Sequence, residues 1–378
     1  MPPGNLEDWV ALHLLPGLGP ILLRRCLDRF GDPGEIAYRV SASAFHEIPG
    51  AGPKLAGLIA SARSSLRARV DREIRAATKL GIRLVPLGDP SYPSALDTLP
   101  DSPAVLYLKG SLAEGIVRLA VVGSRRATAY GRRIAAGLAS GLVARGIEVV
   151  SGGARGIDTC AHVGALEAGG RTVAVLGSGF QRLYPAENAD LFDRIAANGA
   201  VLSEFPLEAE PRPENFPRRN RLISGLSAAV VVVEATVKSG SLTTAGHALD
   251  QGREVLAVPG PVTSEQSAGC HRLIQQGAKL VQRTEDVIEE LSPMYAAALG
   301  PVPSSPEKEA PNVENLAPDE AAVLALLDDP EPVHLDALAD RAPFGIGRLQ
   351  AALFSLEVRG AVEQLPGRYY LSGLRKDR

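Results

Sequence analysis

The sequence predicts an α/β protein, with an extended Rossmann-like parallel sheet as its core, an N-terminal helical domain and a C-terminal winged-helix domain. Between residues 121 and 259, short apolar runs repeatedly end in a glycine-rich turn and lead into a helical pattern. A repeated glycine hairpin lies before this region, and three amphipathic segments lie after it. The expected boundaries are 1–82 for the helical domain, 83–298 for the core, 299–317 for a linker and 318–378 for the winged helix.

The N-terminal domain is predicted from an internal repeat. Residues 15–20 read Leu-Pro-Gly-Leu-Gly-Pro and residues 48–53 read Ile-Pro-Gly-Ala-Gly-Pro, each followed by a helical pattern. The repeat resembles the helix-hairpin-helix motif of SAM-like domains, whose glycine turn presents backbone N–H groups to a DNA phosphate. Residues 1–83 hold 12 Lys/Arg and 8 Asp/Glu, a net charge of +4. Two interpretations stay open: an auxiliary DNA contact, and a domain used only for packing or protein contacts.

The core is predicted from six short apolar runs that read as buried strands. Strands that alternate with helices at this spacing pair in parallel through right-handed crossovers, and ligands bind beyond their carboxyl ends. The turns after the strands are therefore the expected site. The six runs are 119–122, 148–150, 172–176, 200–202, 229–233 and 254–258.

Two of these turns predict a phosphate site. Arg125 lies in the turn at 123–128 and Arg155 in the turn at 151–158, each among small residues before a helix. Small residues let backbone N–H groups approach an anion, the helix N-terminus adds partial positive charge, and a guanidinium can bind bidentately. The sequence lacks the G-x-G-x-x-G dinucleotide fingerprint and the P-loop motif, so a polyphosphate backbone is favoured. The alternative is that both arginines are ordinary solvated surface residues that bind no ligand.

Composition is that of a protein we expect to find in the cytoplasm, without membrane insertion. The chain has 378 residues and 45% hydrophobic content, no apolar run of membrane-spanning length and no signal-like N-terminus. Its three cysteines, Cys26, Cys160 and Cys270, form no C-x-x-C, so neither a disulfide nor a metal site is expected. The net charge of −3 does not oppose DNA binding, because a local cluster of cations can hold a phosphate backbone.

The C-terminal module is predicted from three amphipathic helices at 319–327, 334–341 and 346–359 and a hairpin at 361–371. This order is typical of a winged helix. Residues 315–372 contain 9 Asp/Glu and 4 Arg, a net charge of −5. Duplex binding through the third helix requires more cations, so a protein-interaction or regulatory role is favoured.

Several runs resemble the DNA-processing protein A (DprA) family, densely from about residue 83 to 285 and more loosely in the flanks. These runs are Val-Gly-Ser-Arg at 122–125, Tyr-Gly at 130–131, Ser-Gly at 151–152, Ala-Arg-Gly-Ile-Asp at 154–158, Ala-His at 161–162, Phe-Pro-Arg-Arg-Asn-Arg at 216–221, Glu-Ala at 234–235, Ser-Gly-Ser-Leu at 239–242, Thr-Ala at 244–245 and Ala-Val-Pro-Gly at 257–260.

The resemblance implies a core that binds single-stranded DNA, forms a homodimer and delivers the DNA to the RecA recombinase during natural transformation. Single-strand-binding protein is a further candidate partner. The resemblance implies no catalytic activity, no catalytic residue and no cofactor. The positions it implies for single-stranded DNA binding are Gly123, Ser124, Arg125, Gly152, Arg155, Gly156, Arg218, Asn220, Arg221, Ser239 and Gly240.

The main rival is a Rossmann-type nucleotide-processing hydrolase that cleaves an N-glycosidic bond. Glu204 and Glu234 follow strands, where paired carboxylates could flank a scissile bond. Such hydrolases usually carry a P-G-G-x-G-T run and a following Glu at the fifth turn, which residues 237–244 lack. His162 and Asp158 are interpreted as packing and helix-capping residues rather than as an acid and a base. A pure interaction scaffold is a third option, although it would not require arginines in the turns. Because only 4% of residues are aromatic, we expect little base stacking and weak sequence preference.

Overall fold

The computed structural model describes residues 4–41, 43–291, 295, 316–327, 332–359, 361–365 and 367–372. The chain divides into two compact units, Met1–Pro301 and Val302–Arg378. The predicted linker, 299–317, lies outside the described residues except for its last two. Within the described residues, no helix combines the length and the apolar composition that crossing a membrane needs.

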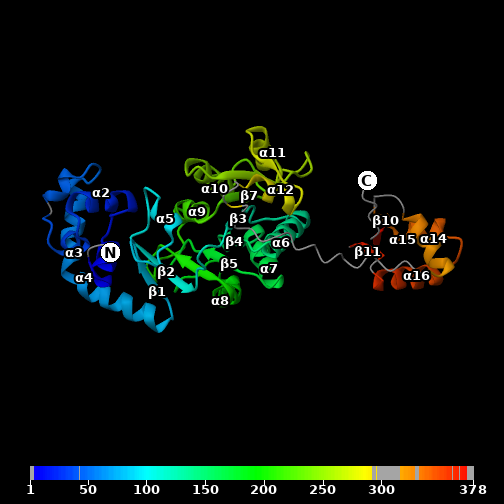
Figure 1. Ribbon diagram of the computed structural model, residues 1–378, viewed down its shortest axis with the longest axis horizontal. Coiled ribbons are helices and arrows are strands. Elements are labelled where there is room, and N and C mark those ends of the chain that lie inside the picture. Colours follow the sequence, from blue (N-terminus) through cyan, green and yellow to red (C-terminus); the bar gives the residue numbers. More distant parts are fainter. Residues whose placement is uncertain are drawn as a thin grey trace. The chain divides into compact units, whose positions relative to one another are not determined.

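One mixed sheet organises the described part of the first unit (Figure 1). Its strands lie in the order β1-β2-β6-β5-β4-β3-β7-β8-β9, and β3 to β9 pair in parallel. The strands β1 and β2 pair antiparallel with each other, and β2 also pairs antiparallel with β6. The strands are β1 (Arg83–Pro86), β2 (Val105–Gly110), β3 (Arg118–Val122), β4 (Glu148–Ser151), β5 (Thr172–Val175), β6 (Ala200–Ser203), β7 (Ala229–Val232), β8 (Glu254–Ala257) and β9 (Lys279–Leu280).

The predicted parallel α/β core is confirmed, and all six predicted strands are present as β3 to β8. These strands are nearly continuous apolar runs because helices cover both faces of the sheet. One face packs against α6, α7, α8 and α12, and the other against α9, α10 and α11. These helices are α6 (Ala129–Ala144), α7 (Ile157–Glu167), α8 (Ala189–Asn198), α9 (Asn215–Gly225), α10 (Gly240–Asp250), α11 (Ala268–Gln275) and α12 (Thr284–Glu290), and the short segments α5 (Ser94–Asp97) and η2 (Ala186–Asn188) lie in connections.

The strand order reverses at β3. From β3 the chain moves outward through β4, β5 and β6, and it then returns to place β7 on the other side of β3. The turns after β3 and β7 therefore diverge to opposite faces of the sheet and leave a crevice at its carboxyl edge.

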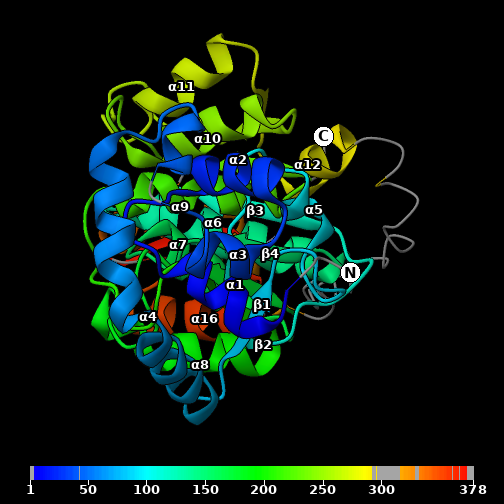
Figure 2. The same ribbon diagram turned by 90° about the vertical axis from the view of Figure 1, so that its left-hand side faces the viewer.

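The N-terminal region, as far as the structure describes it, consists of four α-helices and one short 3-10 helix, and Figure 2 shows it facing the viewer. Both glycine hairpins begin helices: Gly19 caps α2 and Gly52 caps α4, with a proline at the first helical position in each case. The fixed φ of proline and its missing N–H suit that position. The side chains of this region share one apolar cluster with β1 and β2, so it packs directly on the core. The helices are α1 (Leu6–His13), α2 (Pro20–Phe30), α3 (Pro33–Tyr38), η1 (Ala44–Glu47) and α4 (Pro53–Lys79).

The second unit is a winged helix, as predicted. Three helices pack around an apolar cluster, and three short antiparallel strands lie in the order β10-β12-β11. The strand β10 was not predicted from the sequence. The elements are α14 (Pro318–Leu326), β10 (Val333–His334), α15 (Leu335–Arg341), α16 (Ile346–Val358), β11 (Val362–Leu365) and β12 (Tyr369–Ser372).

Candidate nucleic-acid site

A pocket of about 730 Å³ lies where the strand order reverses. Its walls come from the turns after β3, β4 and β7 and from the first turns of α9 and α10. Six of the eleven predicted site residues line it: Gly123, Ser124, Arg125, Asn220, Ser239 and Gly240.

The turn after β3 presents unpaired donors to the pocket. A Cβ at Gly123 would lie 2.7 Å from the Ile157 side chain and 3.0 Å from the Glu234 carbonyl oxygen, so only glycine fits there. The backbone N–H groups of Ser124 and Arg125 have no acceptor among the described residues. Arg125 is exposed and pairs with no carboxylate in the described part of the chain. The turn therefore offers two amides and a free guanidinium to an anion.

The turn after β4 supports the first turn from below. Gly156 has a φ of +79°, which favours glycine, and a Cβ there would collide with the Ser124 carbonyl oxygen. The Ile157 amide donates to the same oxygen at 3.2 Å, which ties the two turns together. Arg155 lies outside the pocket lining, with a half-exposed side chain that pairs with Glu187.

A buried guanidinium lies beneath the pocket. Arg219 is 4% exposed and donates to the carbonyl oxygens of Gly152, at 2.7 Å, and of Val175. Burial lowers the pKa of Arg219 to about 10, so it stays charged at neutral pH. Burial raises the pKa of the neighbouring Asp158 carboxyl, and the positive charge of Arg219 opposes that rise. Arg219 thus holds positive charge under the pocket and fixes the turn that contains Gly152.

Phe216 forms an aromatic surface in the same pocket. The Arg125 guanidinium lies 4.8 Å from the centre of its ring, and that of Arg219 lies 6.0 Å from it. The Tyr184 ring is tilted against Phe216 with 5.6 Å between the ring centres. These distances are typical of cation–π and aromatic pairs. Arg219, Phe216 and Tyr184 were not predicted as site residues, although Arg219 and Phe216 belong to the 216–221 run that resembles the family.

The start of α9 and the start of α10 close the pocket together. The Asn220 amide donates to the Gly240 carbonyl oxygen at 3.1 Å. The Ser239 hydroxyl caps α10 by accepting from the Ser241 amide at 3.3 Å. A Cβ at Gly240 would meet nothing within 4 Å, so this glycine leaves its side of the pocket open.

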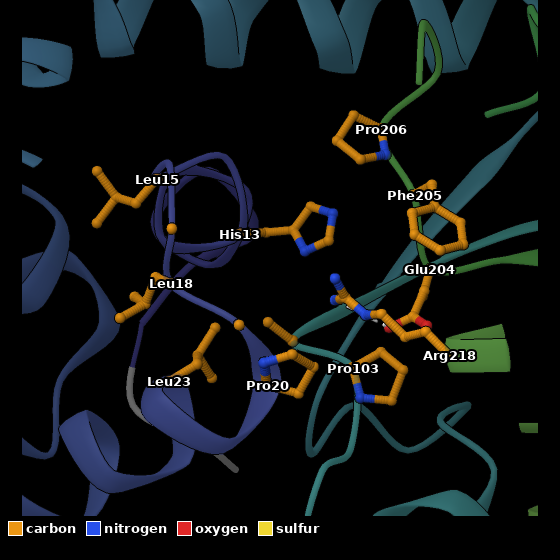
Figure 3. A pocket seen from close by; sticks show the side chains of 13 residues that line it. His13, Leu15, Leu18, Pro20, Leu23, Pro103, Glu204, Phe205, Pro206 and Arg218 are labelled. Carbon is orange, nitrogen blue, oxygen red and sulfur yellow. Dashed lines mark hydrogen bonds and ion pairs between the residues drawn. The ribbon is translucent and has the colours of Figure 1, made fainter. Parts of the chain in front are cut away.

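Arg218 and Arg221 lie elsewhere. Arg221 is buried, and its guanidinium donates to both carboxylate oxygens of Glu204, at 3.0 and 2.9 Å, and to Asp101 at 2.7 Å. A phosphate contact by Arg221 would require breaking these ion pairs. Arg218 lines a different cavity, next to the N-terminal region (Figure 3). The phosphate contacts predicted for both residues stay predictions.

Glu204 and Glu234, the carboxylates on which the predicted hydrolase depends, do not line the pocket, whereas Asp158 and Glu265 do. Glu204 forms an ion pair with Arg221. Glu234 accepts hydrogen bonds from the backbone amide of Thr128 at 3.0 Å and from its hydroxyl at 2.5 Å. Thr128 is the residue that caps the start of α6. His162 is fully buried, and its Nδ1 shares a hydrogen bond with the Thr172 hydroxyl at 2.7 Å. Among the described residues, no group of three or more His, Cys, Asp or Glu could hold a metal ion.

Comparison with known proteins agrees with this geometry. Residues 83–292 match the family model of DNA recombination-mediator protein A, and residues 306–368 match the DprA winged helix domain. Protein Smf of Synechocystis sp. is 34% identical over 393 residues, which cover 96% of this chain and 97% of that protein. The resemblance noted in the sequence motifs is thereby confirmed.

Two solved structures share the fold. The X-ray structure of DNA processing protein A from Streptococcus pneumoniae has a TM-score of 0.67 at 32% identity and covers 77% of this chain and 99% of that one. DNA processing protein A from Helicobacter pylori, described for its single-stranded DNA binding mode, has a TM-score of 0.51 at 29% identity and covers 58% of this chain and 98% of that one. With a family model that spans more than half of its length, the chain belongs to the DNA recombination-mediator protein A family.

Proposed function

We propose that this protein takes part in DNA processing by binding single-stranded DNA, without catalysing a reaction, in the pocket at the carboxyl ends of β3, β4 and β7. The observation that carries the proposal is Arg125, an exposed guanidinium that has no carboxylate partner in the described part of the chain. It lies 4.8 Å from the centre of the Phe216 ring, above the buried Arg219. The DNA-processing names of the relatives, and the single-stranded DNA binding described for the Helicobacter pylori protein, support it.

One phosphate would lie against the turn after β3. The amides of Ser124 and Arg125 and the Arg125 guanidinium converge there as donors, and Arg219 adds positive charge in a poorly solvated position. Donors without acceptors, next to cations, select an acceptor-rich anion. Gly123 and Gly156 are needed because the backbone turns approach too closely for a side chain.

A base would stack beside that phosphate on Phe216. Stacking on an aromatic ring tolerates any base, so the pocket should bind single strands with little sequence preference. A duplex keeps its bases paired and stacked inside, which leaves none free for this surface. We propose Arg155 and Arg218 as further phosphate contacts beyond the pocket, and Asn220, Ser239 and Gly240 as parts of its wall. Gly152 would act behind the wall, where its carbonyl oxygen accepts from Arg219.

The remaining roles that family membership suggests are proposals of the same kind. They are homodimer formation, loading of the RecA recombinase onto the bound strand during natural transformation, contact with single-strand-binding protein, and a cytoplasmic location. Two linked copies would raise avidity through effective concentration. The position of the pocket at one edge of the sheet leaves the rest of the surface for such partners.

The test is a fluorescence-anisotropy titration of labelled oligo-dT at two salt concentrations, with duplex DNA as competitor. We expect Arg125→Ala to weaken binding by about 1.5–3 kcal/mol, roughly 10- to 150-fold, and to reduce the salt slope by about 0.7. The matched control is Arg194→Ala, which removes an exposed arginine on α8 that lies outside the pocket lining. Equal affinity in both variants would refute the site. If the wild-type protein does not bind oligo-dT, the hydrolase becomes the better explanation, and nucleoside monophosphates would then be screened as its substrates.

A further inference from the structure

A second cavity, of about 330 Å³, lies between the first glycine hairpin and the core. The hairpin side contributes His13, Leu18 and Gly19, and the core side contributes Phe205 and Arg218 (Figure 3). The two sides lie far apart in the sequence, so the cavity exists only because the N-terminal region packs on the core.

Arg218 enters this cavity with most of its hydrogen-bonding capacity unused. A guanidinium has five N–H donors. To the residues that the structure describes, the Arg218 side chain makes one long hydrogen bond, from Nη2 to Glu204 at 3.4 Å, and it is 43% exposed. Its guanidinium also lies 5.5 Å from the centre of the Phe205 ring, which holds it in place against the cavity wall.

His13, at the end of α1, and the first hairpin add further unused polar groups. Burial and the charge of Arg218 lower the pKa of His13 to about 4, so at neutral pH its imidazole has one N–H donor and one acceptor nitrogen. Neither ring nitrogen has a hydrogen-bond partner among the described residues, and its Nε2 is buried. The backbone N–H groups of Leu18 and Gly19 also donate to no described residue. Within the described ranges no side chain caps the start of α2 at Gly19, so the partial positive charge of that helix end adds to the cavity.

The carboxylate that lines the same cavity does not cancel these donors. Both oxygens of Glu204 accept from the buried guanidinium of Arg221, at 3.0 and 2.9 Å, so its charge is balanced from behind. Arg218 is left as the cation that remains available to a ligand. Unused N–H donors beside it favour an acceptor-rich anion over a cation or a neutral apolar ligand.

We propose that this cavity binds a phosphate of single-stranded DNA outside the first pocket, with Arg218 and the first hairpin as its ligands. The inference rests on the proposed function. The helix α9 connects the two places: Phe216, Arg219 and Asn220 line the first pocket, while Arg218 faces the hairpin. In this arrangement the first hairpin and the core bind the same DNA strand. The hairpin faces Arg218 of the core, and it does not lie on an open surface that a duplex could approach.

Oligonucleotide length separates this cavity from the first pocket. An oligo-dT of about four nucleotides should fill the first pocket alone, and one of about twenty should reach both. We expect Arg218→Gln and His13→Phe to weaken binding of the longer oligonucleotide about 5- to 10-fold and to leave the shorter one unchanged. The salt slope of the longer oligonucleotide should fall by about 0.7 for Arg218→Gln. Lys54→Gln is the matched control, since Lys54 follows the proline of the second hairpin and lies outside the cavity.

Each outcome decides between the two proposals. If wild-type protein binds neither oligonucleotide, the proposed function fails. If it binds both and the Arg218 and His13 variants match it at both lengths, the second phosphate site is wrong and the first pocket stands. Equal losses at both lengths would assign Arg218 to the first pocket, and would also overturn this inference.

The His13 imidazole is a direct reporter of occupancy. In protein labelled with ¹⁵N-histidine, its signals should shift when the longer oligonucleotide is added, and not with the shorter one. The same spectrum is recorded with inorganic phosphate in place of the oligonucleotide. A shift with inorganic phosphate but none with the longer oligonucleotide would mean a site for free anions, and would exclude the DNA backbone.

Discussion

Replacing Arg221 with methionine separates two roles for this residue, a phosphate ligand and a structural ion pair. Arg221 is 4% exposed and Glu204 is 2% exposed. The variant would leave the Glu204 carboxylate buried with one long contact, to Arg218 at 3.4 Å. Breaking a buried pair by removing one partner costs about 3–5 kcal/mol, because the other charge stays buried without compensation. We therefore expect the free energy of unfolding to fall by that amount.

The assay is urea unfolding followed by tryptophan fluorescence. Trp9 is the one tryptophan of the chain, and it is buried in the apolar cluster that the N-terminal region shares with the core. Arg218→Met is the control, and its loss should stay below about 1 kcal/mol because that side chain is 43% exposed. The double variant Glu204→Leu/Arg221→Met should recover part of the loss, since apolar replacement of both partners removes the unpaired charge.

Two results would refute this reasoning. One is an Arg221→Met protein as stable as the Arg218→Met control. The other is a fully stable Arg221→Met protein that no longer binds oligo-dT, which would make Arg221 a direct ligand of the DNA.

Three further variants test the site and the core. Phe216→Leu should weaken oligo-dT binding by about 1–3 kcal/mol in the anisotropy titration, and unchanged affinity would exclude base stacking there. Glu234→Gln should lower the free energy of unfolding by about 1–3 kcal/mol, because its carboxylate accepts both Thr128 donors at the start of α6; equal urea midpoints would contradict this. Burial and the charge of Arg219 lower the pKa of His162 to about 3. As pH falls below about 6.5, the unfolded chain takes up a proton at this residue that the folded chain does not, so stability falls, by about 2 kcal/mol near pH 5. His162→Gln should remove that part of the pH dependence, and an unchanged pH profile of unfolding would contradict it.

The parallel core could be predicted because each of its strands is a buried apolar run that ends in a turn signal. The strands that the sequence analysis missed show the limits of that signal. The run at β2 is apolar, but it pairs antiparallel and precedes the repeated strand–turn–helix pattern. The strand β9 has two exposed residues, and only its pairing with β8 makes it a strand. Pairing of this kind is decided by tertiary contacts, which a local pattern does not contain.

The site could be predicted at the level of turns, but not at the level of single arginines. Successive residues of a helix point about 100° apart. On α9, Arg219 therefore lies under the first pocket, on a different side of the helix from Arg218 and Arg221. Those two are three residues apart and both contact Glu204, but Arg221 is buried whereas Arg218 lines the hairpin cavity. In the sequence these residues are equivalent members of one basic run. Their separate roles follow from which neighbour covers each face of α9. The aromatic content of the whole chain likewise does not show that Phe216 lies in the pocket.

In the winged helix, too, the arginines near the third helix differ from free cations, because neighbouring carboxylates pair with them. The third helix, α16, contains Arg348, and Arg359 is its C-cap residue. Arg348 donates to both oxygens of Asp319 at 2.8 and 2.6 Å, and Arg359 lies 3.8 Å from Glu320, so acids of α14 occupy both. The outer face of α16 instead exposes Phe354, which is 69% exposed. A duplex would have to displace these ion pairs and would meet an aromatic side chain, whereas a protein surface would bury that side chain favourably. We therefore propose protein contact, rather than duplex binding, as the role of this module.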